Sequence, residues 1–240
     1  MKNSENKVAL ITGGTKGIGF GIAEALLDQG IDVAITGRNK SKAIEAAEKL
    51  KKISTNAQVL GLKGDVTNFN SIQKAVDDTI KQFGKLDIVI ANAGLGHFAS
   101  IEDITIEQWQ DTIDTNLTGA FYTIKASVDA LKASKGYFIT ISSLAGTNFF
   151  ANGSAYNASK FGLTGFTQAV MLDLRKHDIK VSTIMPGSVA TYFNGNIPKP
   201  SDAWKIQSED IGELVVDLIN MNPRTLPSKI EVRPTMPPSK

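Results

Sequence analysis

The chain has 240 residues, of which 42% are hydrophobic, and it contains 21 glycines and no cysteine. This length fits one domain, and the lack of cysteine excludes disulfides, thiolate metal sites and thiol nucleophiles, so that with only two histidines no metal site is expected. The 26 basic and 24 acidic residues give a net charge of +2 and are scattered along the chain, which argues against a nucleic-acid partner.

Short apolar runs rich in β-branched residues alternate with stretches of helical spacing. The expected strands are residues 8–12, 32–36, 58–62, 86–91, 136–142, 180–185 and 229–232. Apolar residues recur at helical intervals between them, at Ile18, Ile22, Ala25 and Leu26, at Ile44, Ala47 and Leu50, at Ile72, Val76, Ile80 and Phe83, and at Phe121, Ile124, Val128 and Leu131. Near-continuous apolar strands are typical of a parallel sheet covered on both faces. The sequence therefore predicts an α/β fold, a doubly wound parallel sheet of the Rossmann type with about seven strands, in one domain spanning residues 1–240.

Two further segments indicate where a substrate lid lies and in which compartment the protein is found. Residues 187–206 follow the sixth expected strand, and Gly195, Pro198 and Pro200 interrupt any period there. Such a loop beyond the carboxyl end of a strand is a candidate substrate lid, with a mobile surface loop as the alternative. Residues 1–7 are polar, and no run approaches ~20 apolar residues, so we expect no secretion signal, no membrane span and a cytoplasmic location.

A glycine-rich loop, residues 12–19, follows the first expected strand and opens the first helix. Glycines allow a tight turn and a close backbone approach, and a helix start presents free N–H groups to an anion such as a pyrophosphate. Glycines also serve ordinary strand-to-helix turns, but three at this spacing favour a ligand. The loop predicts a dinucleotide cradle made by Gly13, Thr15, Lys16, Gly17, Ile18 and Gly19.

The end of the second expected strand bears on the choice of nicotinamide cofactor. A carboxylate there would bind the ribose 2′-hydroxyl of NAD, but residues 36–39 contain no acid, and Asp32 lies at the other end of the strand. Arg38 is placed to pair with a 2′-phosphate, and Lys16 would add a second positive charge. Either cation alone could be an ordinary solvated residue; together they predict NADP(H).

Short polar segments follow the next two strands. Asp65 and Val66 come after the third, and Asn92, Ala93 and Gly94 come after the fourth. These residues can bind an adenine or a ribose, or they can cap the following helix.

Candidate catalytic side chains follow the fifth strand. Ser142 and Ser143 end it, and Tyr156 and Lys160 are four residues apart, which places both on one face of a helix. A neighbouring ammonium is expected to lower the pKa of the tyrosine by roughly 1 to 3 units and make it a usable acid or base. A tyrosine–lysine pair of this spacing is common, however, and usually has no function.

In this combination and order, the glycine loop, the Asn92-Ala93-Gly94 turn, the serine and the tyrosine–lysine pair resemble the short-chain dehydrogenase/reductase family over essentially the whole chain. The resemblance implies that Tyr156 exchanges the proton, that Lys160 holds the nicotinamide ribose and lowers the Tyr156 pKa, and that Ser143 orients the substrate oxygen. It also implies that Asn116 supports a water-linked proton path. Segment 186–191 resembles the part of the family that holds the carboxamide, with Pro186, Gly187, Val189 and Thr191 as contacts.

The resemblance implies an NADPH-dependent enzyme that reduces a small ketone or diketone to an alcohol, with Tyr156 as the proton donor. The alternative is a 3-oxoacyl-acyl-carrier-protein reductase, although residues 228–238 lack the glycine-rich turn usual in that subgroup. The third hypothesis is a regulatory protein that binds NADP without catalysing a reaction. The complete set of Ser143, Tyr156, Lys160 and Asn116 argues against it, because binding alone does not need these residues. The family also implies a homo-oligomer, a dimer or a tetramer.

The sequence predicts the roles of the two histidines and of several loop residues less specifically. His97 could face the substrate or lie on the surface, and His177 stands at a helix end, where we assign it no chemistry. The candidate pocket walls are Asn148, Phe149, Phe150 and Tyr192, with ordinary loop packing as the alternative.

Overall fold

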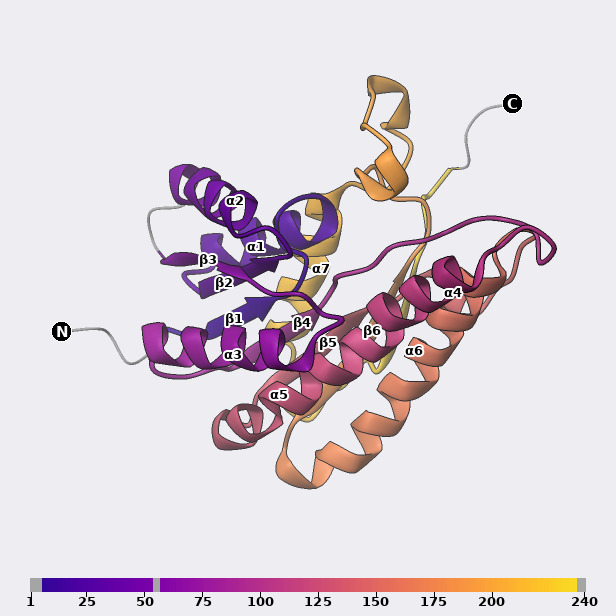
Figure 1. Ribbon diagram of the computed structural model, residues 1–240. Coiled ribbons are helices and arrows are strands. Elements are labelled where there is room, and N and C mark those ends of the chain that lie inside the picture. Colours follow the sequence, from indigo (N-terminus) through magenta and orange to yellow (C-terminus); the bar gives the residue numbers. More distant parts are fainter. Residues whose placement is uncertain (1–5, 54–56, 237–240) are drawn as a thin grey trace.

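The computed structural model describes residues 6–53 and 57–236, which form a central parallel sheet covered by helices (Figure 1). Its strand order is β3-β2-β1-β4-β5-β6-β7, with every neighbouring pair parallel. The strands are β1 (Val8–Ile11), β2 (Asp32–Gly37), β3 (Val59–Lys63), β4 (Ile88–Ala91), β5 (Tyr137–Ile141), β6 (Lys180–Pro186) and β7 (Lys229–Val232). The predicted doubly wound sheet is confirmed; of the expected domain, residues 1–5, 54–56 and 237–240 lie outside the described part. The strand order reverses between β1 and β4, where such sheets bind ligands.

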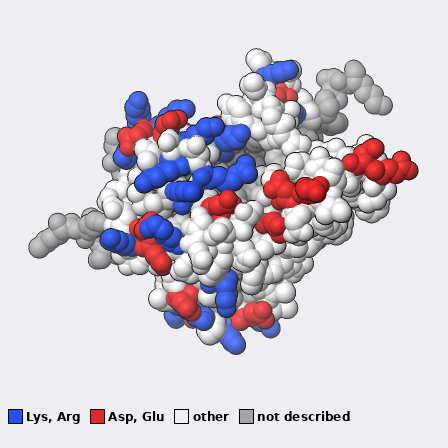
Figure 2. Space-filling model, in the orientation of Figure 1, with Lys and Arg blue, Asp and Glu red and all other residues white. Residues whose placement is uncertain are grey.

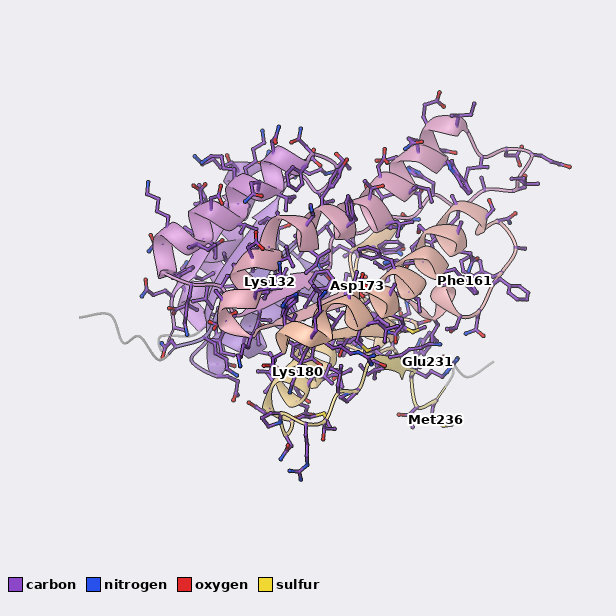
Figure 3. The ribbon with its side chains drawn as sticks, turned by 90° about the horizontal axis from the view of Figure 1, so that it is seen from below. Lys132, Phe161, Asp173, Lys180, Glu231 and Met236 are labelled. Atoms are coloured by element: carbon purple, nitrogen blue, oxygen red, sulfur yellow. The ribbon has the colours of Figure 1, made fainter. Side chains whose placement is uncertain are left out.

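Helices cover both faces of this sheet. One face packs against α1 (Gly17–Asp28), α2 (Lys40–Ile53) and α7 (Ser208–Asn220), and the other against α3 (Phe69–Phe83), α5 (Gly119–Ser134) and α6 (Ser154–Leu174). A short α4 (Ile106–Ile113) runs through a π-helix, Asp114–Thr118, into α5. Seen from below, α5 and α6 lie side by side, with Lys132 on α5 and Phe161 and Asp173 on α6 (Figure 3). None of the described helices is long and apolar enough to span a membrane.

Two of the predicted apolar positions are wrong. Ile44 and Phe121, placed on buried helix faces by their spacing, are each 44% exposed. In α2 the buried stripe is made mainly by alanines and Leu50, which let the helix pack closely against the sheet and leave Ile44 at its edge. Phe121 lies at the surface, where its ring contacts Tyr122 and Phe166.

The segment 187–206 leaves the sheet and returns to nearly the same point. The Ala190 amide donates to the Ile206 carbonyl (2.9 Å) and the Ile206 amide donates to the Ser188 carbonyl (3.1 Å), which closes the base of the loop. Two short 3-10 turns, Phe193–Gly195 and Pro200–Asp202, fill the excursion, which projects from the carboxyl edge of the sheet (Figure 1). The segment is therefore a compact loop on a fixed base, in the place expected for a lid.

Candidate active site

The glycine loop bends sharply between β1 and α1. Gly13 and Gly17 have φ angles of +66° and +59°, a left-handed conformation that side chains rarely adopt. A Cβ on Gly13 would lie 2.9 Å from the Ala93 Cα. The first turn of α1 has no side-chain cap at its N-terminus, so its amides point out of the loop toward the carboxyl edge of the sheet.

Asn92 holds this loop against β4. Its side-chain amide donates to the Thr12 carbonyl (2.9 Å) and the Gly13 carbonyl (3.1 Å), while its backbone amide donates to the Thr12 hydroxyl (3.1 Å). Gly19 lies under the same amide, since a Cβ there would stand 2.5 Å from the Asn92 Nδ2. Both residues therefore shape the cradle from behind, and sequence reasoning missed Thr12 because nothing in its type distinguishes it.

A cavity of about 460 Å³ lies over this edge of the sheet. Its lining includes most residues predicted to bind a cofactor: Gly13, Thr15, Lys16, Gly17, Ile18, Arg38, Asp65, Val66, Asn92, Ala93, Gly94, Tyr156, Lys160 and Thr191. The predicted residues outside the lining are Gly19, Pro186, Gly187, Val189, Asn116 and Ser143. Gly187 pairs with the Val232 carbonyl and Val189 packs on the core, so both form the base of the 187–206 loop. The volume, the glycine backbone and the uncapped helix start fit a dinucleotide.

Two cations stand at one end of the cavity. Lys16 and Arg38 are exposed, and among the described residues neither forms an ion pair within 4 Å. Asp32, at the opposite end of β2, accepts the Gln58 amide (2.7 Å) and cannot reach the cavity. Basic side chains gather around this end, and acidic ones lie over the side of α4 (Figure 2). This end of the cavity therefore favours an anion beyond the pyrophosphate.

Asp65 closes the turn between β3 and α3. Its carboxylate accepts from the Thr67 amide (3.0 Å) and the Thr67 hydroxyl (2.8 Å), and its own amide donates to the Ser71 hydroxyl. Its position therefore fits both predictions from the sequence. Asp65 orders the start of α3, as a capping residue would, and it also lines the cavity, where it could contact an adenine or a ribose.

The candidate catalytic side chains meet at the other end of the cavity. Ser143 follows β5, and its hydroxyl forms a hydrogen bond with Tyr156 in the first turns of α6. The Lys160 ammonium lies one turn further along, 5.7 Å from the centre of the Tyr156 ring, and donates to the Ile141 carbonyl (3.0 Å). The neighbouring Ser142 is buried against α6, where it bonds the Lys160 carbonyl and Thr164, so Ser143 is the serine that faces the tyrosine.

Burial controls the acidity of this pair. Desolvation raises the pKa of Tyr156, and the hydrogen bond from Ser143 only partly offsets it. Desolvation also lowers the pKa of Lys160 from 10.5 to about 8. The predicted lowering of the Tyr156 pKa by the lysine is therefore wrong for this structure, because the phenol is covered by other rings and the ammonium is directed at the Ile141 carbonyl.

Asn116 lies in the π-helix and is 1% exposed. Its Oδ1 accepts the Leu95 amide (2.9 Å), and its Nδ2 donates to the Leu95 carbonyl (2.8 Å) and the Ser159 hydroxyl (2.9 Å). The side chain thus ties the loop after β4 to α6, beside Gly94 and the Lys160 ammonium. Its role in a proton path stays a prediction, while its contacts make it a positioning residue for the site.

Aromatic rings surround the candidate catalytic tyrosine. Phe98 and Phe193 lie with ring centres 5.3 and 5.7 Å from that of Tyr156, and Phe150 lies 5.9 Å from Phe98. We call Phe98, Phe150, Tyr156 and Phe193 the aromatic cluster. Phe98 was missed because it lies far from the other rings in sequence, and Phe150 is the predicted pocket wall that joins the cluster.

The other predicted candidates lie apart from this chemistry. His97 Nε2 pairs with the Asp111 carboxylate at 3.0 Å, outside the cavity lining, and His177 lies in a turn after α6. Phe149 is 86% exposed, and Asn148 bonds the neighbouring backbone. Tyr192 lines the cavity, with the Lys16 ammonium 5.7 Å from its ring centre.

The chain is similar to known oxidoreductases along its length. A family model described as short chain dehydrogenase matches residues 7–202. A trans-4-hydroxycyclohexanecarboxylate dehydrogenase of Sinomonas cyclohexanicum is 36% identical over 88% of this chain and 85% of its own.

Solved structures agree with this match. An alcohol dehydrogenase of the archaeon Thermococcus sibiricus, complexed with 5-hydroxy-NADP, superposes with a TM-score of 0.91 at 28% identity, covering 98% of this chain and 100% of that one. A 3-ketoacyl-ACP reductase of Sinorhizobium meliloti has a TM-score of 0.85 at 32% identity and covers 94% and 97%.

Proposed function

The chain belongs to the short-chain dehydrogenase family of oxidoreductases, and on that premise we propose that it is an NADPH-dependent enzyme that reduces a ketone or diketone to an alcohol. The observation that carries the proposal is the contact of Ser143 with Tyr156, one helical turn from Lys160, at one end of a cavity whose other end has two exposed cations. The relative named for trans-4-hydroxycyclohexanecarboxylate supports a ring alcohol and its ketone as the reacting pair.

The residues around the cavity would hold the cofactor along its length. The glycine loop and the first turn of α1 would bind the pyrophosphate, Asp65 and Val66 the adenosine, and Lys16 and Arg38 the 2′-phosphate. Lys160 would bind the nicotinamide ribose, and segment 186–191, through Thr191, the carboxamide. The neighbour bound to an NADP analogue supports this choice of cofactor.

NADPH, when bound, supplies the hydride that the carbonyl carbon receives. Tyr156 and Ser143 hydrogen-bond the carbonyl oxygen, where negative charge develops, and the phenol then gives its proton to that oxygen. The raised pKa keeps this phenol protonated at neutral pH, so that the proton is present when a substrate binds. The burial that raises the pKa of Tyr156 outweighs the nearby Lys160 ammonium, whose proposed role is to hold the nicotinamide ribose.

The test is NADPH oxidation across a panel of ketones with the parent enzyme and Tyr156→Phe. The variant should lose about 10²- to 10⁴-fold in kcat, the range of a general acid, while its Kd for NADPH, measured by fluorescence, stays within threefold. Near-normal turnover by Tyr156→Phe would remove the assignment of the proton donor. Absence of NADPH oxidation by the parent with every ketone would favour the binding protein.

A 3-oxoacyl-acyl-carrier-protein reductase is the second candidate, supported by the 32% identity to the ketoacyl reductase neighbour. The same assay separates the two functions if carrier-bound 3-oxoacyl thioesters are included. A strong preference for the thioester over free ketones would establish the second candidate in place of the first.

A further inference from the structure

The aromatic cluster is an apolar surface built directly against the proposed proton donor. Phe98 and Phe150 remain 44% and 49% exposed, although both belong to a group of rings in mutual contact. Exposed aromatic rings in contact with a half-buried phenol are typical of a surface that a ligand covers. The three phenylalanines come from three segments: the loop after β4, the loop before α6 and the loop 187–206.

The cluster also leaves little room beside the tyrosine. A Cβ on Gly96 would stand 2.9 to 3.1 Å from atoms of Phe98, Phe193 and Tyr156 at once. Phe193 packs on Tyr156 from a loop whose base is closed by the backbone bonds of Ala190 and Ile206. A substrate must therefore fit between closely spaced rings, which favours a compact molecule over a long polar chain.

Two of the three segments that supply the aromatic cluster contain no Lys or Arg. There is no Lys or Arg between Lys85 and Lys125, and none between Lys135 and Lys160. These two stretches supply Phe98, Phe150 and Tyr156. Lys160 itself is buried and donates to the Ile141 carbonyl, so it offers no free charge at the surface of the cluster.

Nearby charges are mainly negative. The stretch that includes α4 contains Glu102, Asp103, Glu107, Asp111 and Asp114, and acidic side chains gather over this side of the molecule (Figure 2). Asp111 reaches the neighbour of Phe98 through its contact with His97. In the loop 187–206, Lys205 forms an ion pair with Asp202 at 2.8 Å, and the exposed Lys199 acts on the same carboxylate. Lys16 belongs to the glycine loop that we assign to the cofactor.

We propose that the aromatic cluster selects compact, uncharged, apolar ketones and rejects carbonyl compounds that would place a carboxylate or phosphate against its rings. The inference rests on the proposed function and specifies its substrate class. An anionic group entering the cluster would lose its hydration without meeting a cation, and the α4 acids would repel it. An apolar ring would instead exchange water for aromatic contacts.

The first experiment compares two ketones of similar shape, 4-methylcyclohexanone and 4-oxocyclohexanecarboxylate, with the NADPH-loaded enzyme. We expect kcat/KM to favour the neutral ketone by about 10²-fold, the effect of burying a carboxylate without a partner. Equal values for the two ketones would overturn the inference and leave the reductase assignment intact.

Two neighbouring phenylalanines then provide a matched pair of variants. Phe150→Arg places a cation in the cluster and should raise kcat/KM for the carboxylate about tenfold while lowering it for the neutral ketone. Phe149→Arg adds the same charge at a ring that is 86% exposed, and it should change neither value by more than about twofold. Equal effects of the two variants would mean that overall charge, and not the cluster, sets the preference, which would overturn the assignment.

A third variant tests the apolar contact itself. Phe193→Ala should lower kcat/KM for 4-methylcyclohexanone about tenfold but leave acetone within about threefold, because acetone is too small to cover the rings. Equal losses for both ketones would contradict the proposal.

A measurement of ligand binding distinguishes failure of the proposed reductase function from failure of the proposed substrate selection. If the parent oxidised no NADPH with any ketone, the proposed function would fail, yet thermal unfolding of the NADP-loaded protein would still compare the ligands. Greater stabilisation by the neutral ketone than by the carboxylate would support the selection, and equal stabilisation would overturn it.

Discussion

Arg38→Asp tests whether charge at the end of β2 sets the choice of cofactor. Arg38 directly follows β2, is exposed and lines the cavity, and its guanidinium has no ion-pair partner among the described residues. Aspartate at this position would repel a 2′-phosphate and could accept a hydrogen bond from a 2′-hydroxyl. The substitution should therefore lower the efficiency with NADPH and raise it with NADH.

The exposure of Arg38 sets the size of the effect. Two opposite unit charges about 4 Å apart in water attract each other by about 1 kcal/mol. A phosphate monoester carries a charge of about −1.5 to −2 at neutral pH. Loss of the arginine then costs about 1.5 to 2 kcal/mol with NADPH, and reversal of the charge costs about 3 to 4 kcal/mol. Because each 1.4 kcal/mol is a factor of ten, the NADPH/NADH ratio of kcat/KM should fall by about 10²- to 10³-fold.

The assay measures kcat/KM for both cofactors with one ketone, at low and at high salt. The effect should shrink at high salt, since exposed charges are screened. Arg224→Asp is the control, because that exposed arginine lies in the connection between α7 and β7, at the amino edge of the parallel sheet. A ratio that changes less than threefold in Arg38→Asp, or an equal change in the control, would refute the reasoning.

Three further predictions concern the buried lysine, the buried asparagine and the exposed face of α6. Lys160→Met should abolish turnover yet raise the Tm at pH 7 by several degrees, because it removes an ammonium whose pKa burial lowers to about 8; a lower Tm would contradict this. In the parent, the unfolding free energy should rise from about pH 8 to 10.5, because the folded Lys160 has then lost a proton that the unfolded chain still binds, and the variant should lack this rise. Asn116→Ala removes two hydrogen bonds to the half-buried backbone of Leu95 and one to the buried Ser159 hydroxyl, and it should cost about 2 to 4 kcal/mol, or roughly 5 to 15 °C in Tm by calorimetry. A drop below about 2 °C would mean that these contacts are unimportant. For the expected homo-oligomer, Phe161→Glu on the exposed face of α6 should shift sedimentation from dimer or tetramer to monomer, with Phe149→Glu as a control that leaves assembly unchanged; a monomeric parent would refute this.

The parts of the fold that the sequence predicts are those with a strong local signal. The strands are short runs of buried β-branched residues, and each observed boundary lies within two residues of its prediction. The helical spacing placed Ile44 and Phe121 in the core because period alone cannot tell the centre of a buried stripe from its edge. The π-helix that holds Asn116 has no such signal, since its geometry depends on packing between α4 and α6.

The same distinction holds for the candidate site. The glycine loop and the tyrosine–lysine pair each have a local spacing and follow one another in a recognisable order along the chain, so their positions at the cavity could be predicted. The contact of Phe193 and Phe98 with Tyr156 joins segments distant in sequence and needs the folded structure. The direction of the Tyr156 pKa shift was wrong for that reason: the charge of Lys160 is visible in the sequence, but the burial that outweighs it is not.

Burial acts on the tyrosine and the lysine in opposite directions, and the two shifts favour one direction of the reaction. A phenol with a raised pKa retains its proton at neutral pH and can donate it to a developing alkoxide, whereas oxidation of an alcohol needs the phenolate. Lys160, with a pKa of about 8, is still mostly protonated at pH 7 and loses its charge over the alkaline range in which the phenolate would form. The ammonium is therefore present when the tyrosine acts as an acid and is lost when it would act as a base. For the proposed reductase, these two shifts would suit carbonyl reduction near neutral pH, where the phenol holds its proton and the ammonium its charge.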